Sequence, residues 1–387
     1  MKSILATLGL ALALPAALAQ PQGVTKNEIV VGTIQDLSGP AAGLGKQARF
    51  GMQMRVDEIN EQGGIHGRKI RLLVEDSAYD PRKAVLAAQK LVNQDGIFVM
   101  AGHFGTAGNV AVMPLLLEKN IVNFMPLTGA REMYEPAHKL KYAMQQSYYD
   151  QLSVVVPKLV KEKQAKQVCT MYQDDDAGLE MFRGAEAGLK SIGMQFAEKT
   201  TYKRGATDFS SQVARMKAAN CDFVVLGTII RETVGAMAEA RKNDFNPTFL
   251  ASVAAYSDLI PKLGGKAVDG LYAGMASQNP YVDDSSPALR AWATKYQASY
   301  HEDPAVTSAY GYIAMDLFVK GAQKAGPDLS TETLVKAMDS LSVPPDIFGT
   351  DTLSFSPTKR LGSDSARLSQ LQDGRWKVVS DYVKPAR

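Results

Sequence analysis

Groups that could bind an anion gather in one loop, residues 102–108 (GHFGTAG). The loop joins the carboxyl end of a predicted strand to the start of a predicted helix, and we expect Thr106 to be the N-cap of that helix. The free N–H groups of Ala107 and its neighbours, together with the positive end of the helix dipole, suit an anionic oxygen. Each hydrogen bond to a charged group contributes roughly 1.5–3 kcal/mol, so two or three of them would select a carboxylate. An ordinary capped helix with water at its end is the alternative interpretation.

Catalytic patterns are weak in comparison. Residues 43–48 (GLGKQA) fit the G-x-G-x-x-A pattern of a dinucleotide-binding turn, but they lie well beyond the preceding predicted strand, which such a turn should follow almost directly. No G-x-S-x-G nucleophile motif occurs, and residues 174–176 (DDD) lack the alternating spacing of a calcium loop. We therefore expect no enzyme activity, no metal and no cofactor. A secreted NAD-dependent oxidoreductase is a remote alternative.

Histidine and cysteine add no strong site. His103 lies in the anion-binding loop, where a ligand could reach it, although a hydrogen-bonded structural role is favoured. Cys169 and Cys221 lie in or just before predicted strands, and we expect buried free thiols rather than a disulfide. Two cysteines and four histidines in 387 residues also argue against a zinc cluster.

The composition is that of a globular protein with a small net charge. Hydrophobic residues make up 45% of the chain and charged residues 21%, which suits a packed core. The formal net charge of +3 is small for 387 residues, so neither nucleic acid nor anionic lipid is indicated as a partner.

The N-terminus has the layout of a secretory signal peptide. Lys2 precedes an apolar run, and the sequence ALA at 17–19 precedes Gln20, which predicts cleavage after Ala19. A buried N-terminal helix is the alternative. No cysteine follows the run to carry a lipid, and no later segment is long and apolar enough for direct membrane insertion. We expect a periplasmic protein.

Short apolar runs alternate with amphipathic helical patterns along most of the chain. The predicted strands include residues 28–34, 69–74, 97–100, 121–125, 167–172 and 222–226. Strand–helix–strand repeats of this length imply right-handed crossovers and parallel sheets, so the fold class is α/β. The order repeats, which indicates two similarly built lobes that meet between Ala143 and Ser147. The last third completes these lobes, and residues 351–355 and 376–379 are expected to pair as a hairpin.

Four motifs occur together in a specific order: residues 31–40 (VGTIQDLSGP), 60–67 (NEQGGIHG), 76–81 (DSAYDP) and 101–103 (AGH). The series resembles the branched-chain amino acid-binding (type I, leucine/isoleucine/valine-binding protein-like) family of periplasmic solute-binding proteins of ABC transporters. The resemblance implies two Rossmann-like lobes with parallel sheets, joined by a three-stranded hinge. It also implies a monomer that closes on a ligand and docks on a membrane permease. The lobes would comprise residues 24–143 plus 279–345 and residues 147–275 plus 346–387.

The resemblance also implies ligand-binding positions. The residue that binds the ligand carboxylate falls on Thr106, beside Gly105 and Ala107, and the acidic partner of the ligand ammonium falls on Val253. A second contact strip falls on Leu127, Thr128 and Gly129, where glycine replaces a threonine that helps to bind the amino group. Family tyrosines around an aliphatic side chain fall on smaller residues, Leu44, Ala177 and Ile229.

The carboxylate end of such a site is retained here, and the ammonium end is not. A buried ammonium without a paired carboxylate is strongly disfavoured, which argues against α-amino acids. We predict a small organic acid, most favourably an aromatic carboxylate such as a benzoate, phenylacetate or hydroxycinnamate. A branched-chain amino acid is the alternative. Arg231 could add a second contact to the acid, and Tyr148 or Tyr149 could supply a ring face or a hydroxyl.

Overall fold

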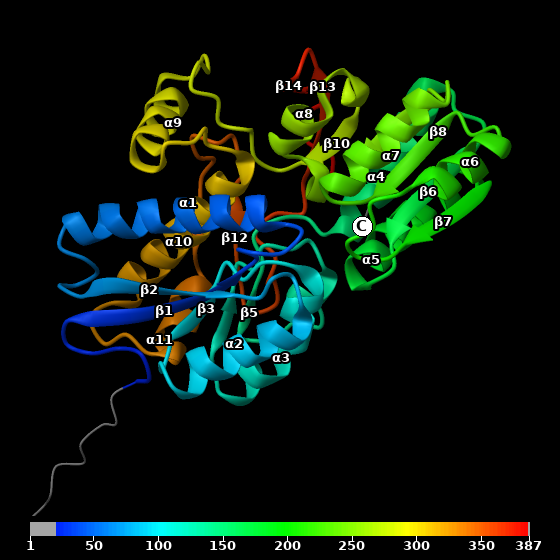
Figure 1. The fold of residues 1–387 in the computed structure, drawn as a ribbon. Coiled ribbons are helices and arrows are strands. Elements are labelled where there is room, and N and C mark those ends of the chain that lie inside the picture. Colours follow the sequence, from blue (N-terminus) through cyan, green and yellow to red (C-terminus); the bar gives the residue numbers. More distant parts are fainter. Residues whose placement is uncertain (1–20, 386–387) are drawn as a thin grey trace, which may run out of the picture.

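The computed structural model describes residues 21–385, which form two α/β lobes (Figure 1). The predicted signal peptide, residues 1–19, lies outside the described residues. The first lobe contains a five-stranded parallel sheet in the order β2-β1-β3-β4-β5. Its strands are β1 Glu28–Gln35, β2 Lys69–Asp76, β3 Val99–Ala101, β4 Val122–Phe124 and β5 Lys141–Tyr142. The predicted α/β class with parallel sheets is confirmed.

Helices cover both faces of the first sheet. Alternate residues of β1 enter different apolar clusters, because successive side chains of a strand point to opposite faces. Ile29 and Val31 join the main core, whereas Val30 and Ile34 join a separate cluster with α2 and α3. The helices of this lobe are α1 Ala42–Glu61, α2 Pro81–Asn93, α3 Thr106–Glu118, α9 Pro287–Tyr300, α10 Val306–Ala325 and α11 Thr331–Met338, with a 3₁₀ turn at Arg131–Met133. The chain thus returns to the first lobe late in the sequence.

The second lobe contains a seven-stranded sheet in the order β14-β13-β10-β9-β8-β6-β7. Strands β6 to β10 are mutually parallel where they pair, and β13 and β14 add an antiparallel edge. The strands are β6 Val168–Gln173, β7 Glu198–Tyr202, β8 Phe223–Gly227, β9 Thr248–Ala251, β10 Tyr272–Met275, β13 Arg367–Gln372 and β14 Arg375–Val378. The helices are α4 Tyr148–Lys163, α5 Asp176–Lys190, α6 Ser210–Ala218, α7 Arg231–Lys242 and α8 Leu259–Gly264, with 3₁₀ turns at Val253–Ala255 and Gly265–Val268.

Three chain segments connect the lobes: those after β5, after β10 and before β13. The third segment runs beside the first, since the N–H of Ala143 donates to the carbonyl of Arg360 and the N–H of Gly362 donates to the carbonyl of Ala143, both at 2.9 Å. It also carries β12 (Leu353–Ser354), which pairs with β11 (Ser342–Val343). Among residues 21–385, no helix has both the length and the apolarity needed to cross a bilayer.

The predicted hairpin between residues 351–355 and 376–379 is wrong. Strand β14 pairs instead with β13, just before it in the chain. The turn between them is Asp373-Gly374, with positive φ at both residues, which is the geometry that a two-residue hairpin turn requires. The Asp-Gly turn therefore determines the partner of β14, in place of the apolar run at 351–355.

The expectation of free thiols is also wrong, because Cys169 and Cys221 form a disulfide. Cys169 lies in β6 and Cys221 just before β8, and these two strands are neighbours in the sheet. The Cα atoms are 5.9 Å apart, within the range that a disulfide spans. Strand adjacency, which sequence spacing does not reveal, brings the two sulfurs together.

Removing this disulfide should lower the free energy of unfolding. The bond closes a loop with a sequence separation of 52 residues, and loops of that size contribute about 2–4 kcal/mol, mainly by restricting the unfolded chain. We expect the Cys169→Ala/Cys221→Ala variant to unfold at lower denaturant concentration while it still binds ligand. Dithiothreitol should lower the midpoint of the native protein and not that of the variant. Equal midpoints with and without reductant in the native protein would contradict this expectation.

Candidate ligand-binding site

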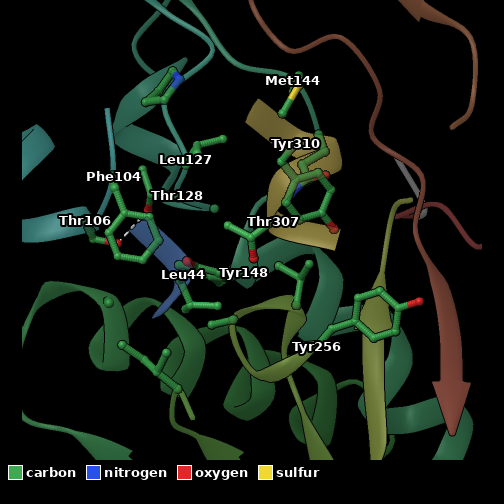
Figure 2. A pocket seen from close by; sticks show the side chains of 18 of the residues that line it. Leu44, Phe104, Thr106, Leu127, Thr128, Met144, Tyr148, Tyr256, Thr307 and Tyr310 are labelled. Carbon is green, nitrogen blue, oxygen red and sulfur yellow. Dashed lines mark hydrogen bonds between the residues drawn. The ribbon is translucent and has the colours of Figure 1, made fainter. Parts of the chain in front are cut away.

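A cavity lies between the two lobes, at the carboxyl ends of β3 and β4. Ligands of open α/β sheets bind at this edge. The cavity contains about 780 Å³ of empty space, part of it open to solvent. Its first-lobe wall comes from the loops after β3 and β4 and from α10, and its second-lobe wall from α5 and the segments after β8 and β9. Figure 2 shows side chains that line it.

Most of the residues predicted to bind ligand line this cavity. They are Leu44, Gly105, Thr106, Leu127, Thr128, Gly129, Tyr148, Ala177, Ile229 and Val253. They come from both lobes and from positions more than 200 residues apart in the chain, so the fold brings them together. That these residues contact a ligand stays a prediction.

Hydroxyl groups meet at one end of the cavity. The side-chain oxygens of Thr106 and Thr128 are 2.6 Å apart and share a hydrogen bond (Figure 2). The buried Tyr148 hydroxyl adjoins them: burial raises the pKa of Tyr148, and hydrogen bonding with the Gly129 backbone and with both threonine side chains partly opposes that rise. We call Thr106, Thr128 and Tyr148 the hydroxyl cluster. Each hydroxyl has one hydrogen to donate, and one of the two threonines uses its hydrogen in the Thr106–Thr128 bond. An acceptor in the cavity receives a hydrogen bond from all three only when it replaces that bond.

The start of α3 differs from the sequence prediction. Gly105, not Thr106, is the N-cap, with a φ of 89°, a conformation that favours glycine. A Cβ at Gly105 would lie 2.9 Å from the ring of Tyr79, so a larger residue would displace that ring as well. Thr106 is instead the first residue of the helix. Its hydroxyl is therefore turned to Thr128 and the cavity rather than used for capping.

Two of the predicted ligand-binding residues in the loop 102–108, His103 and Ala107, do not line the cavity. His103 is fully buried beside Gly108, neither ring nitrogen has a hydrogen-bond partner among the described residues, and burial lowers its pKa to about 3. It is a neutral interior side chain. Ala107 faces a separate small hollow beside Asp80 and Arg204. The N-terminal turn of α3 thus faces two different spaces, and only its first residue reaches the main cavity.

Tyr149 and Arg231 also lie outside the cavity. The guanidinium of Arg131 stacks over the Tyr149 ring at 3.7 Å, and Tyr148, one residue earlier, takes the place in the cavity. Arg231 is the exposed first residue of α7. Ile229 precedes α7 and lines the cavity, whereas Arg231 begins the helix with an exposed side chain, so the two side chains do not share a direction.

The cavity wall is uncharged. None of the described residues that line it is Asp, Glu, Lys, Arg or His. Carboxylates just outside it already have cationic partners: Glu180 pairs with Arg131 at 2.5 Å, and Asp175 pairs with Arg204 at 2.7 Å. Within residues 21–385, no group of three or more His, Cys, Asp or Glu is arranged to hold a metal ion. The arrangement can bind and orient a molecule, and it offers no acid–base pair for catalysis.

Aromatic side chains that the sequence interpretation missed form much of the wall. Besides Tyr148, these are Tyr79, Phe104, Tyr256 and Tyr310, and the missed lining residues also include Pro126, Met144, Gln145, Met181, Ala254 and Thr307. Tyr79 and Phe104 belong to motifs that the sequence singled out, at 76–81 and 102–108, so these two had a local signal. Tyr310 and Thr307 come from α10, far along the chain, where no local pattern marks them.

The residues of the dinucleotide pattern, 43–48, lie inside α1 rather than at a turn between strand and helix. A Cβ at Gly45 would lie 1.9 Å from the carbonyl oxygen of Asp36. This glycine therefore lets the start of α1 pack tightly on the loop after β1. The segment holds the helix in place and has no room for a pyrophosphate.

Comparisons with known proteins agree with this architecture. The family described as periplasmic binding protein matches residues 28–375. The Leu/Ile/Val-binding protein of Escherichia coli (strain K12) is 26% identical over 281 residues, which are 73% of this chain and 76% of the relative. The leucine-specific-binding protein of Salmonella typhimurium is 26% identical over 327 residues, 81% of this chain and 87% of the relative. The resemblance inferred from the motifs is confirmed.

Solved structures share the fold. A fatty acid ABC transporter substrate-binding protein from Thermomonospora curvata superposes with a TM-score of 0.85 at 23% identity, covering 96% of each chain. A branched-chain amino acid ABC transporter protein from Thermus thermophilus, with bound valine, gives 0.84 at 16% identity and covers 94% of this chain and 98% of the other. The chain belongs to the periplasmic binding protein family, as a non-enzymatic, extracytoplasmic solute-binding component of an ABC transporter, with a small ligand and a permease as its partners.

Proposed function

We propose that this protein binds a small organic acid that carries no ammonium group, most favourably an aromatic carboxylate, and delivers it to the permease by lobe closure. The observation that carries the proposal is the hydroxyl cluster at one end of an otherwise uncharged cavity. A carboxylate that replaces the Thr106–Thr128 bond can accept from Thr106, Thr128 and Tyr148, and the N-terminus of α3 adds its positive dipole. Hydrogen bonds to a charged group contribute roughly 1.5–3 kcal/mol each.

The uncharged wall of the cavity disfavours an amino acid. An ammonium group buried there would find no carboxylate among the lining residues, and an unpaired buried charge is costly. Val253, where the family resemblance places an acidic residue, is an apolar side chain that is 8% exposed. The nearest lining groups are equally uncharged. An acid whose remaining body is neutral fits this wall.

Aromatic rings on several sides favour a flat, polarisable body. Tyr79 and Phe104 are tilted against each other with centroids 6.0 Å apart, at the cluster end of the cavity. Tyr256 and Tyr310 supply further rings. Offset and edge-to-face contacts with such rings stabilise an aromatic ligand by about 0.5–1.5 kcal/mol each beyond the burial of its area.

Two other ligand classes have specific support. The relatives named Leu/Ile/Val-binding protein favour a branched-chain amino acid. The Thermomonospora curvata structure is described as a fatty acid ABC transporter substrate-binding protein, and a fatty acid is also a carboxylate with an uncharged body. A fatty acid differs from an aromatic acid in having a chain in place of the ring. A branched-chain amino acid has an aliphatic side chain in place of the ring and also adds an ammonium.

A thermal-shift panel separates the three ligand classes. The protein is first unfolded and refolded to remove any ligand that it carries from purification. The panel would compare benzoate, phenylacetate and cinnamate with octanoate and with leucine, isoleucine and valine. A ligand at a hundred times its dissociation constant adds about 2.7 kcal/mol of stability. We expect the largest shift with an aromatic acid. A shift with the amino acids alone would overturn the proposal, and a shift with octanoate alone would limit it to aliphatic acids.

Replacing Thr106 should weaken the binding of any carboxylate. Thr106→Val keeps the shape of the side chain, removes one donor, and leaves the Thr128 hydroxyl without its partner. We expect the dissociation constant to rise about tenfold, since one hydrogen bond to a charged group is lost. Thr106→Ser, which keeps the hydroxyl, is the matched control. Isothermal titration with the acid found in the panel would measure both, and equal affinities would remove Thr106 from the site.

Two arginines bridge the lobes beside the cavity. Arg131 of the first lobe makes a bidentate pair with Glu180 on α5, at 2.5 and 3.2 Å, and the Glu180 side chain is 4% exposed. Arg204 of the second lobe donates to the carbonyl of Tyr79 at 2.8 Å in the first. Both bridges exist only while the lobes are together, so we propose that they stabilise the closed form.

Glu180→Gln should therefore weaken ligand binding without contacting the ligand. The variant removes the charge that Arg131 neutralises across the cleft, and we expect about a tenfold higher dissociation constant. Glu198→Gln is the matched control, because Glu198 pairs with Arg215 inside the second lobe at 2.7 Å. If calorimetry gave both variants the same affinity as the native protein, the bridge would have no part in closure.

We further propose that residues 1–19 are removed on secretion and that the mature chain works in the periplasm as a monomer. The layout of the N-terminal sequence and the disulfide support an oxidising, extracytoplasmic compartment. Intact-mass measurement of the periplasmic protein would test the cleavage position.

A further inference from the structure

One part of the cavity wall is held in place by Gln151, which does not itself line the cavity. Val253, Ala254 and Tyr256, which follow β9, form this part, and we call these three residues the wall segment. It begins with a 3₁₀ turn, and the N–H groups at the start of a helical turn have no partner within it. The N–H of Ala254 donates to the Ser252 side chain at 3.2 Å, and the N–H of Val253 donates to Oε1 of Gln151 at 2.8 Å. The position of the wall segment therefore depends on a side chain of α4.

Gly274, in β10, leaves the space that the amide of Gln151 fills. A Cβ at Gly274 would lie 2.3 Å from both Cδ and Oε1 of Gln151 and 2.7 Å from Nε2. The Gln151 residue is 1% exposed, so its amide is enclosed between β10 and the wall segment. A side chain packed in this way has little freedom to move. The hydrogen bond to Val253 thus comes from an acceptor whose position is fixed.

The same helical turn also carries a donor of the hydroxyl cluster. Gln151 lies three positions after Tyr148 on α4, so the two side chains share one face of the helix. Tyr148 reaches Thr106 and Thr128, whereas Gln151 reaches the wall segment. In Figure 2, Tyr256 of the wall segment lies well away from these two threonines. The first turn of α4 therefore links two separate parts of the cavity.

We infer that Gln151 is a positioning residue that fixes the distance between the hydroxyl cluster and the wall segment, and that it thereby determines which acids fit. A wall held at its first N–H does not shift to follow a shorter or a longer ligand, so one length is favoured. Without the acceptor, a buried N–H would lack a partner, which is costly, and the wall segment would move. This inference rests on the proposed function, because the carboxylate of the ligand must lie at the hydroxyl cluster.

Three acids that carry the same ring at increasing distance from the carboxylate test this selection: benzoate, phenylacetate and cinnamate. Isothermal titration would give their dissociation constants for the native protein and for Gln151→Met, which keeps the length of the side chain and removes the amide oxygen. We expect the preferred acid to bind about tenfold more weakly to this variant. The ratio between the weakest and the tightest dissociation constant should fall towards one.

Thr170→Val is the matched control. It removes another buried hydrogen bond of the second lobe, from the Thr170 hydroxyl to the carbonyl of Val225 at 2.9 Å, and neither residue lines the cavity. Each of the two variants leaves a buried backbone group without its side-chain partner, so both should melt at a lower temperature. Only Gln151→Met should change the ratio between the acids.

The fluorescence of Trp376 reports on the wall segment without any ligand. Its ring centroid is 5.0 Å from that of Tyr256, its Nε1–H donates to the carbonyl of Ser257 at 2.8 Å, and the residue is 5% exposed. The other tryptophan of the chain, Trp292, would be replaced by phenylalanine in every protein measured. Movement of the wall segment would expose the indole of Trp376 to water, and a hydrated indole emits at longer wavelengths. We expect this shift in Gln151→Met and not in Thr170→Val.

Gly274→Ala reaches the same amide from the opposite side. Its Cβ would displace Gln151, so the ratio between the acids should fall as in Gln151→Met. In a Gln151→Ala background, where no amide is left to displace, the change at Gly274 should have little effect. A full effect of Gly274→Ala in that background would contradict a role for the amide.

Several outcomes would overturn the inference while the binding of an acid stood. These are an unchanged ratio or an unchanged emission in Gln151→Met, an equal fall of the ratio in Thr170→Val, and equal affinities of the native protein for the three acids. If none of the three acids bound the native protein, the proposed aromatic ligand would fail, and the selection by length with it. The emission of Trp376 would then still decide whether Gln151 positions the wall segment.

Discussion

Replacing Gly129 with alanine is expected to raise the dissociation constant for a carboxylate ligand roughly 100-fold. A Cβ at this position would lie 2.7 Å from Cδ1 and 2.8 Å from Cε1 of Tyr148. Carbon atoms do not approach so closely, and the rigid ring would have to move as a whole. The Tyr148 hydroxyl would then leave Thr106 and Thr128, and the displaced ring would enter the space that the ligand needs. One methyl group would thus disturb both the donor set and the shape of the cavity.

A double-mutant cycle shows whether the effect passes through Tyr148. Tyr148→Phe alone keeps the ring and removes one donor, so we expect about a tenfold loss. In a Tyr148→Ala background the methyl group that Gly129→Ala introduces has no ring to displace, and the change at Gly129 should then cost little. If Gly129→Ala bound as tightly as the native protein, or if its full effect persisted in the Tyr148→Ala background, this account of Gly129 would be wrong. Calorimetry with the same acid would supply all four affinities.

The cluster end of the site could be predicted because local sequence determines it. Thr106 and Thr128 each follow a short apolar strand, and neighbouring parallel strands end at the same edge of a sheet. The position of both residues beside the cavity follows from that rule alone. The exact role of Thr106 did not follow: glycine takes the capping position, which leaves the threonine hydroxyl free to meet Thr128.

The parts that could not be predicted depend on long-range contacts. The disulfide required β6 and β8 to be neighbours, although another strand and two helices separate them in the sequence. Tyr310 reaches the cavity because α10 returns to the first lobe after the whole second lobe has been built. Arg231 was predicted from its place after a strand, but its direction depends on the turn into α7, which points it to solvent. Spacing along a strand or a loop can be read from a sequence, whereas the packing of distant segments cannot.

Tyr148 is a residue that the sequence singled out, but its place in the site depends on contacts between segments. It is the first residue of α4 in the second lobe, yet its ring packs on Gly129, and its N–H donates to the Gly129 carbonyl at 2.6 Å. The hydroxyl cluster therefore combines two threonines of the first lobe with a tyrosine at the start of the second lobe. A change in the angle between the lobes would move this hydroxyl relative to Thr106 and Thr128. We expect the donor set to be complete only while the lobes are together, so that acid binding favours closure.

Val253→Glu should abolish the binding of an acid, with a loss of at least about 100-fold at pH 8. Val253 lines the cavity and is 8% exposed, and its N–H is held by the Gln151 side chain at 2.8 Å, so the backbone there is fixed. A glutamate at this position would place a negative charge in a wall that contains no cation among its described residues. That charge would repel a carboxylate ligand across a poorly solvated space. Val253→Gln is the control, since it adds nearly the same volume without the charge.

The pH dependence of this variant has a definite sign. Burial without a cationic partner raises the pKa of the introduced carboxyl above its ordinary value of about 4.3. The repulsion is fully present above that raised pKa and is lost as the pH falls through it, so acid affinity in Val253→Glu should recover between pH 8 and pH 6. The Val253→Gln affinity should stay constant over the same range. The same glutamate would give an ammonium ligand the partner that the native wall lacks, so binding of leucine should appear in Val253→Glu and not in Val253→Gln. If the native protein already bound leucine and the glutamate did not strengthen that binding, an acidic partner would have to exist elsewhere in the cleft, and the ligand would be an amino acid.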